Sequence, residues 1–416
     1  MAGVFYGWWV TLAFSVMVFL STGVRFSVGP FLKPMVADLH TDRATYSLIV
    51  SLSLFLYGAY MPFIGRLVDR LGVRPVAVTG TVLFAGAIAA TGLVQDLLQL
   101  TVIYGVVLAL GLSATGHVVG SAAVSRWFVR RRATALSVLG AASMAGMSLL
   151  VPVAMWLVLK VGWRLAYGIL GLAALVILLP LTLWLVRESP ESLGLHPDGE
   201  APAGRVLAAD DERTGIRVAT RSLPFWQLSG GMFTCGFSMS LLSAHGVPML
   251  TDHGYPAMLA SWALGLLGAS SMLLAVLLGR LADRFGRRPV LAWLYATRAL
   301  LFVGLFFVHD SPAALLLLAA MGGSSMGGSL AMTSALTADI FGRFSVGTVF
   351  GTIFFVHQGG AALGSWLGGF LFEATGGYGP AFAVASGQLV LGALLSLTID
   401  GRRRPMASLS PTPQRA

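Results

Sequence analysis

Residues 165–186, LAYGILGLAALVILLPLTLWLV, run for 22 positions without a charged side chain. A helix of that length is long enough to cross the roughly 30 Å hydrocarbon core of a bilayer, at about 1.5 Å per residue. Single strands cannot cross, because their backbone groups find no hydrogen-bond partners in lipid. The whole chain is 56% hydrophobic and only 11% charged, whereas about a quarter of a soluble protein is charged. We therefore predict an all-α membrane protein that crosses the bilayer repeatedly.

Twelve apolar stretches lie between charged or Pro/Gly-rich breaks. Their approximate cores are 8–28, 45–64, 76–95, 98–124, 134–158, 164–186, 225–249, 257–279, 290–308, 312–337, 348–370 and 379–399. The polar segment between the sixth and the seventh is rich in Pro, Gly and Asp, as a linker is. We expect four parts, which are an N-terminal six-helix bundle (1–186), a cytoplasmic linker (187–223), a C-terminal six-helix bundle (224–400) and a cytoplasmic tail (401–416).

The net charge of +10 would suggest nucleic-acid binding in a soluble protein, but its distribution indicates a membrane protein. Of the 27 Lys and Arg residues, 16 fall in short segments on the side of the N-terminus and 4 in segments on the opposite side. Cytoplasmic loops have this excess, so we expect both termini in the cytoplasm and the chain in a plasma membrane such as a bacterial inner membrane. The start, MAGVFYGWWV, has no basic region and is interpreted as the first span, not as a cleaved signal.

The positions of the acidic residues and the single cysteine exclude several kinds of functional site. All 17 Asp and Glu residues lie in predicted loops or at span ends, so proton coupling would need a histidine, an acid at the membrane edge, or a proton carried with the substrate. The single Cys235 excludes disulfides and thiolate metal clusters. The glycine-rich stretch GSSMGGS (323–329) lacks the lysine of a nucleotide-binding loop. We expect no metal, no cofactor and no enzymatic activity.

The segments GRLVDRLGVRP (65–75) and GRLADRFGRRP (279–289) nearly repeat each other at an offset of 214 residues. The same offset places 125–140 on 339–354, and 162–168 on 376–382. Three landmarks at one offset predict two homologous bundles. Because six is an even number of spans, the bundles have parallel orientation. Transporters with this kind of repeat move one half against the other around a central site.

Twelve spans, a 6+6 repeat and a Gly-Arg-Leu-x-Asp-Arg-x-Gly-x-Arg-Pro motif after helices 2 and 8 resemble the major facilitator superfamily over residues 5–400. The resemblance implies that these loops latch gating helices together, with Asp69 and Asp283 in that role. The motif residues are Gly65, Asp69, Arg70, Gly72, Arg74, Gly279, Asp283, Arg284, Gly286 and Arg288. An alternative is that the motif only anchors the cytoplasmic side through its positive charge. That alternative would explain the arginines, but not the spacing of Gly and Asp.

Further stretches are similar to the monocarboxylate transporter branch of that family. They are FYGWWV (5–10), RWFVRRRATALSVLGAASMAG (126–146), RESPESLGLHPDG (187–199) and HGVPMLTDHGYP (245–256). Two departures stand out. No acid precedes Gly7, and Ala275 occupies the position in helix 8 where this branch usually has the arginine that clamps a carboxylate.

The resemblance implies a secondary transporter that takes up a small organic anion, such as a monocarboxylate, together with protons by alternating access, as a monomer in the lipid bilayer. Nucleic acid is not an expected partner. The alternative is a proton-driven efflux antiporter for amphipathic compounds, although such antiporters typically have a membrane-embedded acid. A non-transporting sensor with the same fold would predict a large additional domain, for which the loops are too short.

In this family helices 1, 4, 7 and 10 line the cavity, and helices 2, 5, 8 and 11 lie beside them. Arg25, in the first span, can bind a carboxylate through two hydrogen bonds, or it extends to the outer interface instead. His117 lies nine residues before Arg126 and hence near the midplane. Its imidazole can bind an anion or pass a proton, unless it only packs against a neighbouring helix.

His357 and Gln358 are about ten residues into the eleventh span. As neighbours they are expected to point in different directions, with one in the cavity and one packed. His245, at the outer end of the seventh span, binds substrate, gates the site or caps the interface. Tyr57, Ser143 and Met144 are expected pocket walls, and Ser143, the repeat mate of His357, is expected to face it across the site. Arg298 lies on a supporting helix and is expected either in a buried pair or extending inward to the interface.

Overall fold

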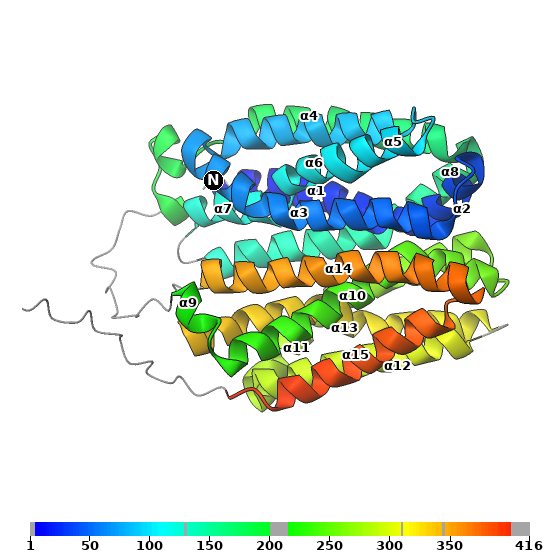
Figure 1. Cartoon of the computed structure of the whole chain (residues 1–416). Helices are drawn as coiled ribbons and strands as arrows, with labels where there is room; N and C mark the ends of the chain where they lie inside the picture. The colour runs from blue at the N-terminus through cyan, green and yellow to red at the C-terminus, as the bar shows by residue number, and fades with distance from the viewer. Residues whose placement is uncertain (1–4, 129–130, 200–214, 309–310, 343–345, 401–416) are drawn as a thin grey trace, which may run out of the picture.

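A computed structural model describes residues 5–128, 131–199, 215–308, 311–342 and 346–400. All regular elements in these ranges are helical, which confirms the predicted all-α class. Figure 1 shows long helices side by side in two groups, with the N-terminal half above the C-terminal half. We call the end of the bundle that holds Arg74, Arg126 and Arg287 the basic end, and the opposite end the Asp252 end. The tail at 401–416 and linker residues 200–214 lie outside the described residues.

The N-terminal half contains the first six predicted spans. Its elements are α1 (Gly7–Phe26), α2 (Val28–Asp38), α3 (Arg43–Leu71), α4 (Val73–Thr91), α5 (Leu97–Leu100), the π-helix η1 (Thr101–Leu108), α6 (Ala109–Thr115), α7 (His117–Trp127) and α8 (Arg132–Trp184). The Asp42 carboxylate accepts a hydrogen bond of 2.7 Å from the backbone N–H of Thr45 and thereby caps α3. That bond holds the pKa of Asp42 below its usual range.

The C-terminal half contains the other six spans. Two short 3-10 turns (Pro190–Leu193 and Pro197–Gly199) and α9 (Ile216–Ala219) precede it. Its elements are α10 (Leu223–Asp252), α11 (Ala257–Phe285), α12 (Arg287–Phe307), α13 (Pro312–Phe341), α14 (Val346–Thr375) and α15 (Gly379–Leu397).

Four predicted spans differ from simple separate helices. The first is broken at Ser27 and continues as α2, and the fourth consists of α5, η1, α6 and α7, with a break at Gly116, which has an extended backbone. The fifth and sixth spans share the label α8, but the backbone is non-helical at Gly162, where one helix ends and the next begins. A break in a membrane helix leaves backbone groups to be satisfied by neighbours, so it is tolerated inside the protein or beside a cavity.

Helices α10 and α14 form a close pair within the C-terminal half. They pack on each other through glycines, since a Cβ on Gly236, Gly360 or Gly364 would overlap a carbonyl oxygen of the other helix. Close contact through small residues is typical of membrane helix pairs. Nine of the described helical segments, with 134–184 counted once, are long and apolar enough to cross a membrane.

The predicted repeat is visible in the backbone. Gly72 has φ 93° and ψ 168°, and Gly286, 214 positions later, has φ 88° and ψ 154°. Gly162 (φ 76°) and Gly376 (φ 74°) form a second pair at the same offset. Only glycine adopts such conformations at little cost, so both halves use the same turns at equivalent places.

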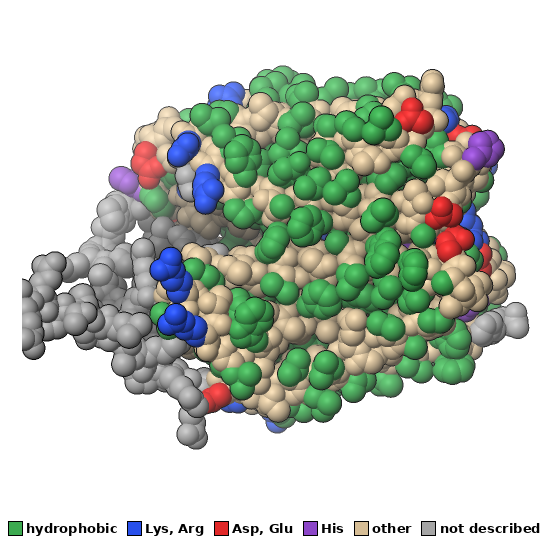
Figure 2. All heavy atoms as spheres, viewed as in Figure 1, with side chains coloured by type: hydrophobic (Ala, Val, Ile, Leu, Met, Phe, Trp, Pro, Cys, Tyr) green, Lys and Arg blue, Asp and Glu red, His purple; other side chains and the backbone are tan. Residues whose placement is uncertain are grey.

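The outer surface fits a bilayer. Figure 2 shows apolar side chains over the long sides of the helices and charged side chains at the two ends. Large apolar residues are exposed along this surface, among them Trp156, Leu172, Trp262, Leu300 and Leu394. Lipid is the environment in which such a surface is stable.

Replacing Gly286 with alanine is expected to lower the free energy of unfolding by about 1–3 kcal/mol, because its φ and ψ lie in a region open essentially to glycine alone. The new Cβ would have room, with Pro289 Cδ at 3.8 Å, so the cost is one of backbone strain. Gly72→Ala should cost more, because its Cβ would lie 2.6 Å from the Glu188 carboxylate. Thermal unfolding in detergent measures both. Gly140→Ala, helical with open space around it, is the control, and a Gly286→Ala protein as stable as wild type would contradict the argument.

Candidate functional site between the two halves

Arg25 lies at the end of α1, where the two halves meet. Its Nη2 donates a hydrogen bond of 3.1 Å to Oε1 of Gln358 on α14. Its guanidinium carbon lies 4.8 Å from the centre of the Tyr57 ring, a distance at which a cation is attracted to an aromatic face. None of the ion pairs among the described residues includes Arg25. The structure therefore places this arginine inside the protein and not at a membrane interface.

The space beside Arg25 is small. A cavity of about 10 Å³ adjoins its guanidinium, which is at most the room that one water molecule needs. Its walls are Val24, Arg25, Val28, Val50, Ser53, Leu54, Tyr57, Tyr104, Leu108 and Leu112. The structure thus brings Arg25 and Tyr57 together as predicted, in a state too tightly closed for a carboxylate to enter.

His357 and Gln358 do not point in different directions as expected. The His357 ring stacks on Phe354, and its Nδ1 lies 3.4 Å from Oε1 of Gln358. Because that oxygen can only accept hydrogen bonds, Nδ1 is the donor in this contact. Both side chains are buried, and both Nε2 atoms have no hydrogen-bond partner among the described residues.

His117 begins α7 directly after the break at Gly116. A Cβ on Gly116 would lie 3.2 Å from the Tyr57 hydroxyl, so the break lies against the side chain that also contacts Arg25. His117 is half-buried. The structure thus keeps His117 near this group without bringing it into contact with Arg25.

Ser143 and Met144 lie on α8, where they contact α1 and α13, respectively. Ser143 is buried, and its Oγ donates to Oγ1 of Thr22 on α1 at 3.1 Å. The hydrogen-bond partner of Ser143 is thus on the neighbouring helix of its own half, and its facing His357 across the site stays a prediction. The Sδ atom of Met144 would lie 3.6 Å from a Cβ on Gly327, so Met144 packs across the two halves.

His245 is fully buried in a network away from Arg25. Its Nε2 lies 2.8 Å from the carbonyl oxygen of Ser365 and 3.3 Å from Oγ of Ser47. Its Nδ1 lies 3.3 Å from the hydroxyl of Tyr378. Both nitrogens thus have partners, and the contact with Ser47 joins the two halves. The geometry fits the gating alternative for His245.

Asp252 holds the halves together at its end of the bundle. Its carboxylate lies 2.6 Å from Nζ of Lys33 and 2.7 Å from Nη1 of Arg43, both in the N-terminal half. The backbone N–H of Arg43 donates to Glu373 at 2.9 Å, and the Arg43 guanidinium lies over the Phe372 ring. This end is closed by charged side chains.

The contacts between the halves extend from there only to the middle of the bundle. Along α3 and α14 they include the bond of 2.6 Å from Ser51 Oγ to the carbonyl of Ala362, and the Phe55–Phe355 ring pair. In the described residues no hydrogen bond or ion pair between the halves lies nearer the basic end than Gln358. In Figure 2 the surface recedes between the halves at the basic end. The molecule is closed at the Asp252 end and open toward the basic end.

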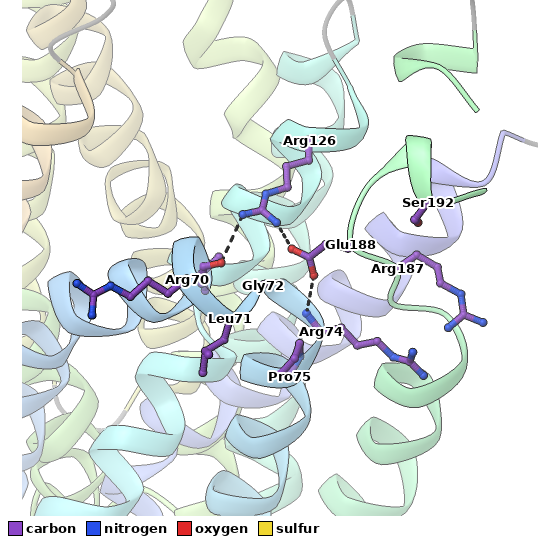
Figure 3. Close-up of a pocket in the computed structure, with 10 residues that line it drawn as sticks. Arg70, Leu71, Gly72, Arg74, Pro75, Arg126, Arg187, Glu188 and Ser192 are labelled. Carbon is purple, nitrogen blue, oxygen red and sulfur yellow. Dashed lines mark hydrogen bonds and ion pairs between the residues drawn. The ribbon is translucent and has the colours of Figure 1, made fainter. Parts of the chain in front are cut away.

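Glu188 latches the first basic strip. It accepts hydrogen bonds from the backbone N–H groups of Val73 (2.8 Å) and Arg74 (3.3 Å) and pairs with Arg126. Figure 3 shows this carboxylate between Arg126 and the start of α4, whereas Arg70 points away from it. Carboxylates stabilise helix N-termini in this way. A cavity of about 550 Å³ adjoins the group. The side chain of Asp69, the predicted latch, lies outside the described residues.

The second strip has related contacts. Arg287 pairs with Asp339 and donates to the carbonyl of Ala335 at 3.0 Å, while Arg288 donates to the carbonyl of Ile399. The surroundings of Gly279 and the side chain of Asp283 lie outside what the structure describes. Arg284 is exposed beside Phe285. Both strips therefore tie helix ends together, with acids that the motif itself does not contain.

Glu188, Asp252 and Arg43 are functional candidates that were not predicted from the sequence. Glu188 follows the last span and belongs to no motif, so nothing in the sequence pairs it with Arg126. Asp252 lies 214 residues after Asp38, and this repeat relation was a signal that could have drawn attention to it.

Comparison with known proteins agrees with this geometry. Residues 14–274 and 228–415 match the sequence model of the Major Facilitator Superfamily. An MFS-type transporter of Bacillus subtilis, YcxA, is 29% identical over 89% of this chain and 90% of its own. Monocarboxylate transporter 13 of Bos taurus is 26% identical over 95% and 89%, and monocarboxylate transporter 11 of Homo sapiens is 27% identical over 98% and 85%.

Solved structures share the fold. A bacterial homologue of the human lysosomal transporter Spinster, in an inward-facing and occupied conformation, superimposes with a TM-score of 0.71 at 16% identity, over 97% of this chain and all of that one. Its inward-facing, unoccupied form gives a TM-score of 0.68.

Replacing Asp252 with asparagine is expected to shift the protein toward a state that is open at the Asp252 end. Each lost ion pair at such a partly exposed place contributes up to about 1 kcal/mol, so the population should change by roughly five- to thirtyfold. Spin labels at Ala37 and Pro256, in the two halves, should show longer distances in pulsed electron resonance. Asp38→Asn is the matched control, because Asp38 pairs with Arg164 in its own half. Equal distance distributions in wild type and Asp252→Asn would contradict the assignment.

Proposed function

This chain belongs to the major facilitator superfamily of membrane transporters, and on that premise we propose that it takes up a small organic anion, such as a monocarboxylate, together with protons by alternating access. The observation that supports this most strongly is Arg25, a cation between the two halves whose partner across the interface is the neutral amide of Gln358. A central site between two moving halves is where such transporters bind their substrates.

Arg25 has the chemistry to bind a carboxylate. A guanidinium offers paired N–H groups that match the two oxygens of a carboxylate, and a charged acceptor binds it more strongly than a neutral one. The oxygen of Gln358 takes the place of one carboxylate oxygen in the closed state. Tyr57, over whose ring the guanidinium lies, would hold the arginine in position for the substrate.

His357 has the chemistry to accept the coupled proton. With its Nδ1 donating to Gln358, its buried Nε2 is a free acceptor. A proton on Nε2 would turn this atom into a second donor for the anion, and the same Gln358 side chain contacts Arg25. Protonation and anion binding would thus favour each other at adjacent groups.

The relatives agree with this substrate class, since several are named as monocarboxylate transporters. We further propose that the basic end faces the cytoplasm, because it has the arginines of both strips, and that the protein acts as a monomer in a plasma membrane such as a bacterial inner membrane. The state closed at the Asp252 end would then be the one that releases substrate inside.

Uptake of radiolabelled lactate, pyruvate or oxalate into proteoliposomes should rise when the inside is more alkaline than the outside, and Arg25→Gln should lower it about 10- to 100-fold, the cost of hydrogen bonds to a charged group. Arg25→Lys should retain part of the uptake, because it keeps the charge without the paired donors. Arg164→Gln, which removes an arginine paired with Asp38, is the control. Wild-type uptake by Arg25→Gln, or no uptake of any carboxylate together with binding of amphipathic cations, would contradict the proposal.

Replacing His357 with glutamine should abolish the stimulation by a proton gradient while exchange of labelled for unlabelled substrate at equal pH continues, because exchange needs no net proton movement. His117→Gln is the matched comparison and should keep the stimulation. The ratio of gradient-driven uptake to exchange, measured on the same vesicles, reports the difference. If His357→Gln responds to the gradient as wild type does, the proton uses another group.

A further inference from the structure

A second arginine is buried in the C-terminal half. Arg298 of α12 is 0% exposed, and its guanidinium lies between α10 and α13. Within the described part of the chain its partners are the carbonyl oxygens of Ser325, Met326 and Cys235, the hydroxyls of Ser238, Ser325 and Ser329, and the sulfur of Cys235.

No ion pair among the described residues includes Arg298. No carboxylate among the described residues is thus the partner of this arginine. Hydroxyls, carbonyls and the Cys235 sulfur take up its donors instead. A charge without a counter-ion is costly inside a protein and in a membrane, and such residues are candidates for function.

Cys235 connects Arg298 to the site between the halves. Its sulfur lies 3.1 Å from Nη1 of Arg298, and the next residue, Gly236, packs directly against the backbone of His357. His357 contacts Gln358, which binds Arg25. Cys235, His357 and Gln358 thus lie in succession between two guanidiniums, one from each half.

The groups between the two arginines have free polar atoms. Nε2 of His357 and Nε2 of Gln358 are buried and have no hydrogen-bond partner among the described residues. Buried polar atoms are rarely left unpaired. The sulfur of Cys235 also contacts Sδ of Met239 at 3.7 Å, and Met239 is partly exposed. The partly exposed Met239 thus connects this group to the protein surface.

The geometry points to Arg298 as the cation of the C-terminal half of the substrate site, where it attracts the organic anion toward Cys235 and His357 while Arg25 binds it from the N-terminal half. This inference rests on the proposed function. It gives a replacement for the helix 8 cation that is absent at Ala275 of α11. Arg298 acts here through its field and through Cys235, and is a positioning residue.

Cys235 is the single cysteine of the chain, so thiol labelling of the unmodified protein reports on this place alone. The probes are two methanethiosulfonates of similar size, the anionic sulfonatoethyl and the cationic trimethylammonioethyl reagent. The thiolate attacks the sulfenyl sulfur, a mixed disulfide forms and methanesulfinate leaves. Rates are divided by those of each reagent with a free thiol, and incorporation is measured by intact-protein mass spectrometry on the full chain in nanodiscs.

We expect the wild type to react about tenfold or more faster with the anionic reagent, since one unit charge within a few ångströms changes the local energy by more than 1.4 kcal/mol even at moderate screening. Arg298→Gln should abolish this preference, and Arg298→Lys should restore most of it. Cys235→Ser should not be labelled, and Arg164→Gln should keep the wild-type preference.

Equal rates for the two reagents in wild type, faster reaction of the cationic one, or no labelling by either would overturn the inference, and these outcomes need no variant that must fold. An unchanged preference in folded Arg298→Gln would do so as well. The labelling does not depend on uptake. Charge-selective labelling that needs Arg298, without uptake of any carboxylate, would sink the proposed substrate and leave the inference standing. Carboxylate uptake together with unselective labelling would sink the inference alone.

Discussion

The hydrocarbon interior of a bilayer offers no hydrogen-bond partners, so every polar group at that depth must be satisfied within the protein. This constraint accounts for much of the arrangement. Helices α10 and α14 lie against each other through glycines. Arg298 is surrounded by carbonyls and hydroxyls of α10 and α13, and Arg25 is bound to Gln358 across the two halves. The protein can hold these two charges at this depth because neighbouring helices supply the hydrogen-bond acceptors that lipid lacks.

The duplicated fold is used unequally by its two halves. Gly72 and Gly286 form the same turn in each half, yet side chains at equivalent places have different partners. Asp38 pairs with Arg164 within the N-terminal half. Its repeat mate Asp252 pairs with Lys33 and Arg43 across the interface. An acid that braces one half in the first copy thus closes the protein in the second. The two halves thus share a backbone, and the contact that closes the protein arises because Asp252 has other partners than Asp38.

Local sequence patterns were sufficient for the fold but not for the contacts between halves. Twelve apolar stretches and the 214-residue offset predicted the helices and the repeat, because apolar length and turn glycines are properties of short segments. Arg25 and Tyr57, each named from its own span, contact each other in the structure. Their contact, like the bond of Ser143 to Thr22 on the neighbouring helix, depends on how helices pack, which no local pattern specifies. Asp252 was not recognised as a gate, since its partners come from another half whose position no local pattern specifies.

Gln358 contacts the proposed substrate-binding arginine and also joins the two halves. In the structure, which is closed at the Asp252 end, the side-chain oxygen of Gln358 accepts a hydrogen bond from Arg25 and so joins α14 to α1. A carboxylate accepts from a guanidinium more strongly than an amide does, so an entering anion would displace Gln358 and break a contact between the halves. The pairs of Asp252 also join the halves, so they would add to the binding energy that is needed before the halves separate. On the proposed function, a neutral or cationic compound would not displace Gln358, and negative charge would be the trigger of the movement as well as the feature that is recognised.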